Sequence, residues 1–308
     1  AAFNHQHIFI DPSPDAEKSF IERERLFNLP RSTWSDYKAE LISTGGGIFL
    51  RSAKSIRITL QMKERFDIRA DAMTPNELIS ALLKAPVDLI WNGGIGTYVK
   101  SSRELHSDVG DKANDAVRVN GGEVRARVIG EGGNLGMTQL GRIEYALKGG
   151  LCNTDFIDNA GGVDCSDHEV NIKILLNDIV QNGDLTQKQR NQLLVEMTDE
   201  VAQLVLDNNY RQTQTISIAR SESVYRMGEY RRYIQALVAS GKLDRDLEFI
   251  PGDEELHERI VNGKGLMRPE LAILLSYTKA ILKDALRDSS LPDDDYISRE
   301  IEKAFPKV

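Results

Sequence analysis

The first half of the chain mixes strand-like and helix-like patterns of hydrophobic and polar positions. Residues 2–10 alternate as a strand does, and the turn-forming run 11–15 ends the alternation. Residues 15–29 carry apolar positions at helical spacing. The predicted apolar stripe of that helix consists of Phe20, Ile21, Leu26 and Phe27. The same patterns predict strands at 48–50, 87–91 and 124–130, and helices at 34–42, 74–84, 111–118 and 138–148.

Beyond residue 169 the chain shows helical patterns and no convincing strand. Helices are predicted over 170–181, 186–206, 209–239, 251–261 and 268–287, with a short one after Pro292. Mixed elements followed by helices alone indicate an α/β part over residues 1–180 and an all-helical part over residues 181–308. Because the chain opens in mid-strand without a methionine, we expect it to be a fragment of a longer polypeptide.

One segment, residues 128–169, contains twice the same arrangement, an apolar run that ends in a turn with an asparagine. It runs from a strand into a Gly/Asn-rich turn and a helix, then through a short apolar run into a second predicted turn at 159–162. Each apolar run therefore ends in a flexible turn that carries an asparagine. Open α/β sheets bind ligands at the carboxyl ends of their strands, so we expect a binding crevice here.

Three glycines follow the strand predicted at 87–91. Gly93 and Gly94 lack a Cβ, which lets a flat or charged ligand approach the backbone, although a tight strand–helix connection needs glycine as well. Asn134 offers an amide donor and acceptor for a ribose hydroxyl, a carboxamide or a carboxylate. It fits equally well as a turn or capping residue.

The second turn is predicted to open into a helix at about Asp164. The N-terminus of a helix favours anions, and Ser166 in its first turn could bind a carboxylate. We interpret the acidic residues at 164, 167 and 169 as complements to the helix dipole rather than as metal ligands. No metal site is expected.

Charge and cysteine content narrow the class of protein. The net charge is −8, from 39 basic and 47 acidic side chains, which argues against a nucleic-acid surface. No apolar run is long enough to cross a bilayer. The two cysteines lack CxxC spacing, and we interpret them as reduced thiols of a cytoplasmic protein.

Several motifs together resemble a known enzyme family. EGGN at 131–134 and NAGGV at 159–163, with a serine three residues later, resemble two signatures of the glutamate dehydrogenase superfamily. WNGGIGTYVK at 91–100 and GLMRPELAILLSYTK at 265–279 resemble the large bacterial NAD-specific glutamate dehydrogenases, and the likeness extends over essentially the whole chain. It implies a truncated Rossmann-like, doubly wound parallel sheet followed by an all-helical region. The implied reaction is oxidative deamination of L-glutamate to 2-oxoglutarate and ammonia, with NAD as the hydride acceptor.

The resemblance also implies residue roles on the cofactor side. Gly93 and Gly94 would let the dinucleotide lie against the sheet. Asn134 would face the nicotinamide and the substrate, and Asn159 would lie beside the nicotinamide ribose and the substrate.

On the substrate side, the resemblance implies that Val163 lines the pocket beside the reacting carbon. Ser166 would hydrogen-bond the side-chain carboxylate of glutamate. A dehydrogenase for an apolar amino acid would have no use for that hydroxyl.

The chain also departs from the family pattern. The catalytic Lys and Asp of the family belong to a preceding substrate domain, and the phosphate-binding glycine turn follows the first strand of the dinucleotide domain. Neither is found in these 308 residues, so we assign no catalytic residue and expect the isolated chain to be inactive. The complete enzyme is expected to be a homo-oligomer. The alternatives are a dehydrogenase for another amino acid and a helical regulatory or assembly module with a vestigial nucleotide fold.

Overall fold

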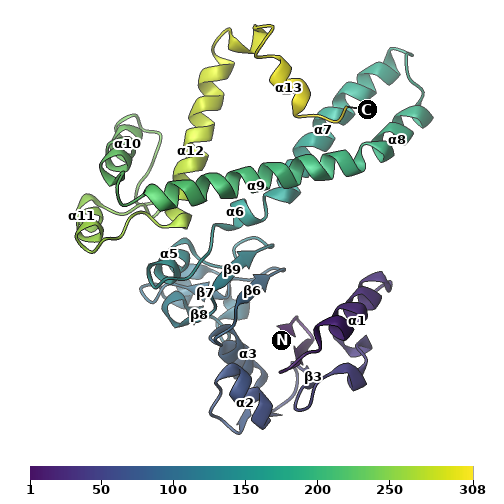
Figure 1. The fold of residues 1–308 in the computed structure, drawn as a ribbon, viewed down its shortest axis with the longest axis vertical. Coiled ribbons are helices and arrows are strands. Elements are labelled where there is room, and N and C mark those ends of the chain that lie inside the picture. The colour runs from purple at the N-terminus through teal and green to yellow at the C-terminus, as the bar shows by residue number, and fades with distance from the viewer. Residues whose placement is uncertain (308) are drawn as a thin grey trace.

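The first fifty residues form a small antiparallel sheet with one helix packed on it (Figure 1). The computed structural model describes residues 1–307. Strands β1 (Ala2–Phe3), β2 (His7–Ile10) and β3 (Gly47–Leu50) lie side by side in that order. The prediction of a single strand over 2–10 is therefore wrong. The side chain of Asn4 accepts hydrogen bonds from the backbone N–H groups of Gln6 and His7, which stabilises a turn between β1 and β2. The strand predicted at 48–50 is confirmed.

Helix α1 (Ala16–Asn28) matches the predicted helix but not its predicted apolar stripe. Only Leu26 of the stripe is buried, where it packs with Phe9, while Phe20, Ile21 and Phe27 are exposed. The helix buries Glu22 instead, because Arg25 donates two hydrogen bonds to that carboxylate at 2.9 and 2.6 Å.

The helix predicted over 34–42 is replaced by two single 3-10 turns, Trp34–Asp36 and Ala39–Leu41. Thr33 caps the first of them. The aromatic ring of Trp34 stacks on Phe9 at a centroid distance of 4.5 Å, and this packing favours a compact turn over a regular helix.

Two short helices connect this sheet to the rest of the molecule. They are α2 (Leu60–Phe66) and α3 (Pro75–Leu83), and the strands β4 (Ile56–Arg57) and β5 (Ala72–Met73) pair beside them. The predicted helix start at Thr74 is confirmed. Its hydroxyl accepts from the N–H of Glu77, and the Glu77 carboxylate accepts from the N–H of Thr74 at 2.8 Å.

Parallel strands form the centre of the α/β part. Strand β6 (Leu89–Asn92) pairs with β9 (Val128–Glu131), and a single parallel bridge joins Val128 to Leu151. A second parallel pair consists of β7 (Val99–Lys100) and β8 (Val119–Asn120). Helix α5 (Gln139–Leu147) packs on β7 and begins at its N-cap Thr138, as predicted. The chain is therefore a mixed α/β protein with small parallel sheets.

Two predictions in this part are wrong. A central strand of apolar residues is expected to be buried, but Leu89 and Trp91 of β6 are 56% and 61% exposed. Both side chains lie on the same face of the strand, and that face is left uncovered within residues 1–307. The helix expected at 111–118 is reduced to a 3-10 turn at Lys112–Asn114, and the short helix α4 (His106–Val109) precedes it. Arg118 is buried, and it donates to the carbonyl of Thr97 at 2.8 Å.

The remainder of the described chain is helical, and no strand lies between residues 170 and 307. The helices are α6 (Asp155–Asp158), α7 (Ala160–Gln181), α8 (Gln187–Glu196), α9 (Thr198–Glu222), α10 (Met227–Ala239), α11 (Asp253–Val261), α12 (Arg268–Arg287) and α13 (Arg299–Lys303). The prediction of one long helix over 209–239 is wrong. The helix ends at Glu222, where the buried Ser223 packs against the backbone of Gly265.

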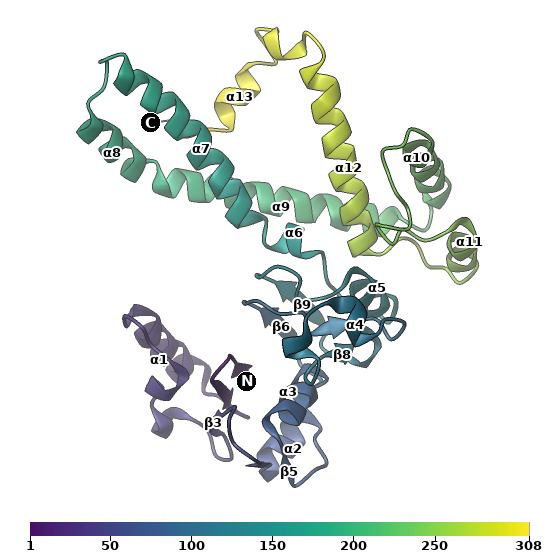
Figure 2. The same ribbon diagram turned by 180° about the vertical axis from the view of Figure 1, so that it is seen from behind.

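Helix α9 runs along the helical region, with α12 rising from one end and α7 and α8 at the other (Figures 1 and 2). Helix α12 contacts both α9 and α5, so it links the helical region to the α/β part. One main hydrophobic core, built around Ile79 and Val119, lies in the α/β part. The other, built around Ile234 and Leu271, lies in the helical region and includes the first turns of α12. Within residues 1–307, no helix is both long and apolar enough to span a membrane.

Candidate functional site

The site is built where the parallel strands β6 and β9 end together. Their register pairs Asn92 with Glu131, so the two following turns start side by side. The turns are packed closely: a Cβ on Gly133 would lie 2.5 Å from the carbonyl oxygen of Gly94. The indole of Trp91 lies over Gly130, where a Cβ would come within 2.7 Å of the ring. Gly133 is therefore required by the packing of one turn on the other, and Gly130 by the ring of Trp91.

A buried cluster of charged side chains holds the turn that follows β9. Arg142 of α5 donates to both oxygens of Glu131, at 2.7 and 2.9 Å, and forms an ion pair with Asp155 at 2.9 Å. The carboxylate of Asp155 also accepts from the N–H of Leu135 at 2.8 Å. Burial raises the pKa of the Glu131 carboxyl, and the hydrogen bonds from Arg142 oppose that rise. The turn is thus fixed by charged contacts at both its ends.

The two predicted asparagines meet directly. The side-chain amide of Asn159 donates to the Oδ1 of Asn134 at 2.8 Å. Asn134 is exposed and Asn159 is half-buried. The contact joins the turn after β9 to the junction between α6 and α7, which are 25 residues apart in sequence.

The prediction of a flexible turn at 159–162 and a helix start at about Asp164 is wrong. Helix α7 begins at Ala160, and neither Gly161 nor Gly162 has a positive φ. Helix α6 ends at Asp158, so the chain passes from one helix into the next with only Asn159 between them.

The earlier helix start places three predicted residues on one side of α7. Asn159, Val163 and Ser166 are spaced four and three residues apart, which is the spacing of neighbours on one helix face. Val163 is 68% exposed and Ser166 is exposed, so both are open to a ligand. Ser166 lies in the second helical turn and not in the first, so its position does not rest on the helix N-terminus.

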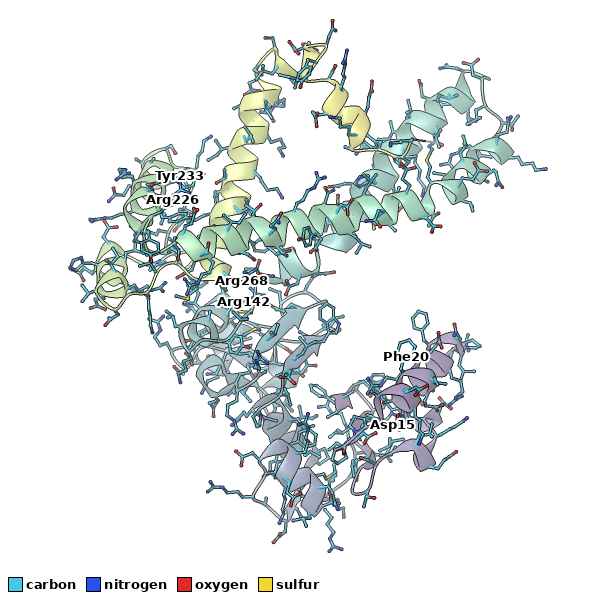
Figure 3. All side chains as sticks on the ribbon, viewed as in Figure 1. Asp15, Phe20, Arg142, Arg226, Tyr233 and Arg268 are labelled. Carbon is cyan, nitrogen blue, oxygen red and sulfur yellow. The ribbon has the colours of Figure 1, made fainter. Side chains whose placement is uncertain are left out.

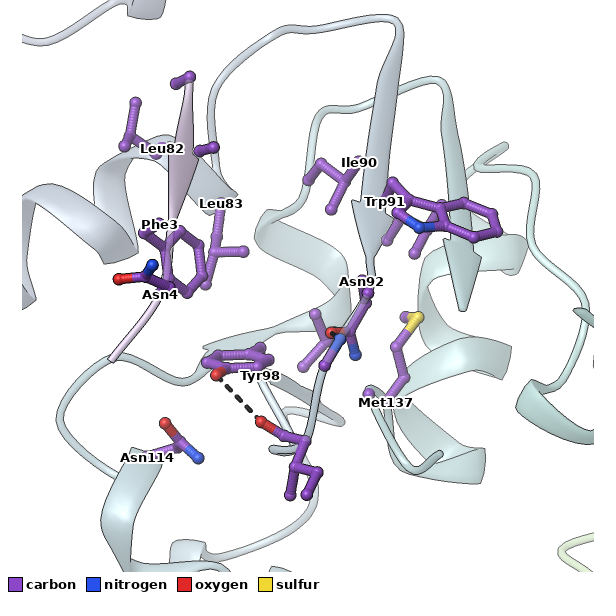
Figure 4. Close-up of a pocket in the computed structure, with 18 of the residues that line it drawn as sticks. Phe3, Asn4, Leu82, Leu83, Ile90, Trp91, Asn92, Tyr98, Asn114 and Met137 are labelled. Carbon is purple, nitrogen blue, oxygen red and sulfur yellow. Dashed lines mark hydrogen bonds between the residues drawn. The ribbon is translucent and has the colours of Figure 1, made fainter. Parts of the chain in front are cut away.

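Gly93 and Gly94 line a cavity of about 900 Å³, which Figure 4 shows. Phe3, Leu82 and Leu83 line one side of it, and Ile90 and Trp91 lie on the other. A Cβ on Gly94 would meet no atom within 4 Å, so packing inside the described chain does not explain this glycine. The space beside it is open to an external group.

Sequence reasoning missed Asn92, which also lines the cavity. Its buried Nδ2 has no hydrogen-bond partner within residues 1–307. This nitrogen is covered by Gly136, because a Cβ on that glycine would lie 1.8 Å from it, so Asn92 lines the cavity without presenting its Nδ2 to a ligand. The signal was available in the sequence, because Asn92 directly precedes the glycine pair at the end of a strand.

The comparisons with known proteins fit this geometry. The family described as "Bacterial NAD-glutamate dehydrogenase, catalytic domain" matches residues 1–219. The chain belongs to this family. A second family, "Glutamate dehydrogenase, C-terminal", matches residues 263–308. The family resemblance predicted from the motifs is therefore confirmed.

Three proteins named NAD-specific glutamate dehydrogenase are similar to this member of the family. The chain is 69% identical to the protein of Pseudomonas aeruginosa and 62% identical to that of Halomonas elongata, in each case over 100% of the chain. It is 49% identical to the protein of Mycobacterium tuberculosis over 99% of the chain. In each case it spans 19% of the length of the relative.

Proposed function

We propose that this chain supplies the nicotinamide- and glutamate-facing wall of an NAD-dependent glutamate dehydrogenase. The enzyme oxidatively deaminates L-glutamate to 2-oxoglutarate and ammonia, with NAD accepting the hydride. The observation that carries the proposal is the hydrogen bond between Asn159 and Asn134 at the ends of the parallel strands. Ligands of open α/β sheets bind at this edge.

The asparagine pair has the chemistry for both ligands. Asn159 uses its amide N–H to bind Asn134, which leaves the Oδ1 of Asn159 as an acceptor and the Nδ2 of Asn134 as a donor. The acceptor suits a ribose hydroxyl or a carboxamide, and the donor suits a carboxylate. Val163 and Ser166, on the same face of α7, provide an apolar wall and a hydroxyl for the side-chain carboxylate of glutamate. Gly93 and Gly94 give the dinucleotide access to the backbone.

We also propose that residues 1–180 are the later part of a Rossmann-like dinucleotide-binding domain and residues 181–308 a helical C-terminal domain. The classic strand order of that fold places the first strand between the second and the fourth. In this chain β1 and β6 each have an unpaired edge within residues 1–307, and both line the 900 Å³ cavity. A preceding first strand would occupy the part of this cavity between β1 and β6 and pair with β6, while the part beside Gly93 and Gly94 stays open for the dinucleotide.

Hydrogen exchange tests the proposed strand. We expect the backbone amides of residues 89–92 to exchange more slowly in the complete enzyme than in the 308-residue chain. Equal exchange in both proteins would contradict the proposed pairing.

The catalytic Lys and Asp are assigned to the part of the enzyme outside this chain. The isolated chain is therefore expected to show no NAD-dependent turnover of glutamate, and measurable turnover by the purified chain would refute this assignment. We further propose that the complete enzyme is a cytoplasmic homo-oligomer that binds neither nucleic acid nor membranes.

Replacement of the Ser166 hydroxyl tests whether glutamate is the substrate. In the complete enzyme, Ser166→Ala should raise the KM for glutamate about tenfold and leave the KM for NAD unchanged, because only the substrate carboxylate loses a hydrogen bond. Ser221→Ala, on the exposed side of α9, is the matched control. An unchanged KM for glutamate in the Ser166 variant, or faster turnover of an apolar amino acid by the wild type, would favour a dehydrogenase for another amino acid. Self-association of the complete protein without any NAD binding would favour the assembly module.

A further inference from the structure

A chain of hydrogen bonds runs from the helical region to the candidate site. At the start of α12, Arg268 donates from Nε to the Oδ1 of Asn153 at 2.8 Å. The Nδ2 of Asn153 donates to the Oδ1 of Asp158 at 2.7 Å. The other oxygen of Asp158 accepts from the backbone N–H of Glu131 at 3.0 Å.

The end of this chain of contacts touches both halves of the asparagine pair. Asp158 directly precedes Asn159, and Glu131 is the last residue of β9 before the turn that carries Asn134. Asn153 uses its amide oxygen toward Arg268 and its amide nitrogen toward Asp158, so its orientation is fixed from both sides. Arg268 is therefore connected, through two side chains, to the backbone next to both asparagines.

Arg268 has the surroundings of a positioning group. It is half-buried, and its Nη1 donates to the hydroxyl of Ser217 on α9 at 2.9 Å. Figure 3 labels Arg268 and Arg142 close together where the helical region meets the α/β part. Arg142 contacts Glu131 at the end of β9 from within the α/β part, whereas Arg268 is connected to the same residue from the helical region through Asn153 and Asp158.

We propose that Arg268 is a positioning residue that acts through Asn153 and Asp158 to hold the Asn134–Asn159 pair in its binding geometry. The helical region thereby sets the affinity of the site for its ligands. The kinetic consequence rests on the proposed function, while the structural link does not.

A purely structural role for Arg268 would be to tie α12 to α9. Lys279 provides the matched control, because it lies on the same helix and its Nζ donates to Gln212 of α9 at 2.9 Å. Replacement of either residue by methionine removes a basic group and keeps an apolar stem. Only Arg268 is connected to Asn153.

Kinetics of the complete enzyme test the proposal. Arg268→Met and Asn153→Ala should each raise the KM for glutamate and for NAD about tenfold, with a smaller change in kcat. The double variant should be no worse than the worse single variant, because both changes break the same link. Lys279→Met should leave both KM values unchanged. Additive effects, or equal effects in the Arg268 and Lys279 variants, would overturn the proposal.

Hydrogen exchange gives a readout that does not require activity. The amide N–H of Glu131 should exchange faster in the Arg268→Met and Asn153→Ala enzymes than in wild type, and at the wild-type rate in Lys279→Met. Exchange that is unchanged in the first two variants would refute the link. A wild-type enzyme that does not oxidise glutamate would refute the proposed function, and the exchange rates would still decide the role of Arg268.

Discussion

Loss of Arg142 is expected to destabilise this chain far more than loss of a nearby arginine on the surface. The Arg142 side chain is 4% exposed and the Glu131 side chain 1%. Arg142→Met leaves a buried carboxylate without its cation, a change that costs about 3–5 kcal/mol of the free energy of unfolding. Arg127 and Asp88 form an ion pair at 3.4 Å with side chains 81% and 82% exposed, so Arg127→Met should cost about 0–1 kcal/mol.

Urea denaturation followed by far-UV circular dichroism measures both losses on the 308-residue chain. A second substitution sharpens the test, since Glu131→Gln in the Arg142→Met background should restore part of the lost stability by removing the unpaired charge. The deficit of the single variant should also grow as the pH rises above 4.5. A carboxyl group whose pKa is raised by folding stabilises the folded state at low pH and loses that contribution at higher pH. Equal losses in the Arg142 and Arg127 variants, or no recovery in the double variant, would refute this account of the buried cluster.

Three further predictions concern helix α1 and the glycine turns. The hydrogen bond from Arg25, joined by the N–H of Lys38 and opposed by burial, lowers the pKa of Glu22 from 4.5 to about 2. Wild-type stability should therefore fall as the pH drops from 4.5 toward 2, and Glu22→Gln should flatten this fall in pH-dependent urea titrations while the exposed Glu24→Gln should not. Gly133→Ala should cost about 1–3 kcal/mol in the same assay, because its Cβ would press on the backbone of Gly94. Gly94→Ala should leave stability within about 1 kcal/mol of wild type and raise the KM for NAD in the complete enzyme, and a large stability loss in this variant would show that the glycine serves packing instead.

Local signals in the sequence were sufficient to predict many elements. The capping residues at Thr74 and Thr138 set their helices where the structure has them, because a cap depends only on residues within the next turn. The predicted apolar stripe of α1 was wrong because Phe20 and Phe27 are not covered by any other element within residues 1–307. Periodicity predicts which side of a helix is apolar, and it cannot show what covers that side.

The sequence predicted which residues to consider for the site but not how they are arranged. The motif NAGGV at 159–163 was expected to form a turn because two adjacent glycines disfavour a helix. In the structure α6 leads directly into α7, so the glycines take helical backbone and Asn159, Val163 and Ser166 share one face. The contact between Asn134 and Asn159, and the link through Asn153 to Arg268, depend on long-range packing that no local pattern encodes.

The central claim is that Asn159 lies where the cofactor and the substrate meet. Its most direct test is the pair of KM values, for NAD and for glutamate, of Asn159→Ala in the complete enzyme. The account predicts that both values rise about tenfold or more, because one side chain serves both ligands. Wild-type KM values for both ligands would contradict it.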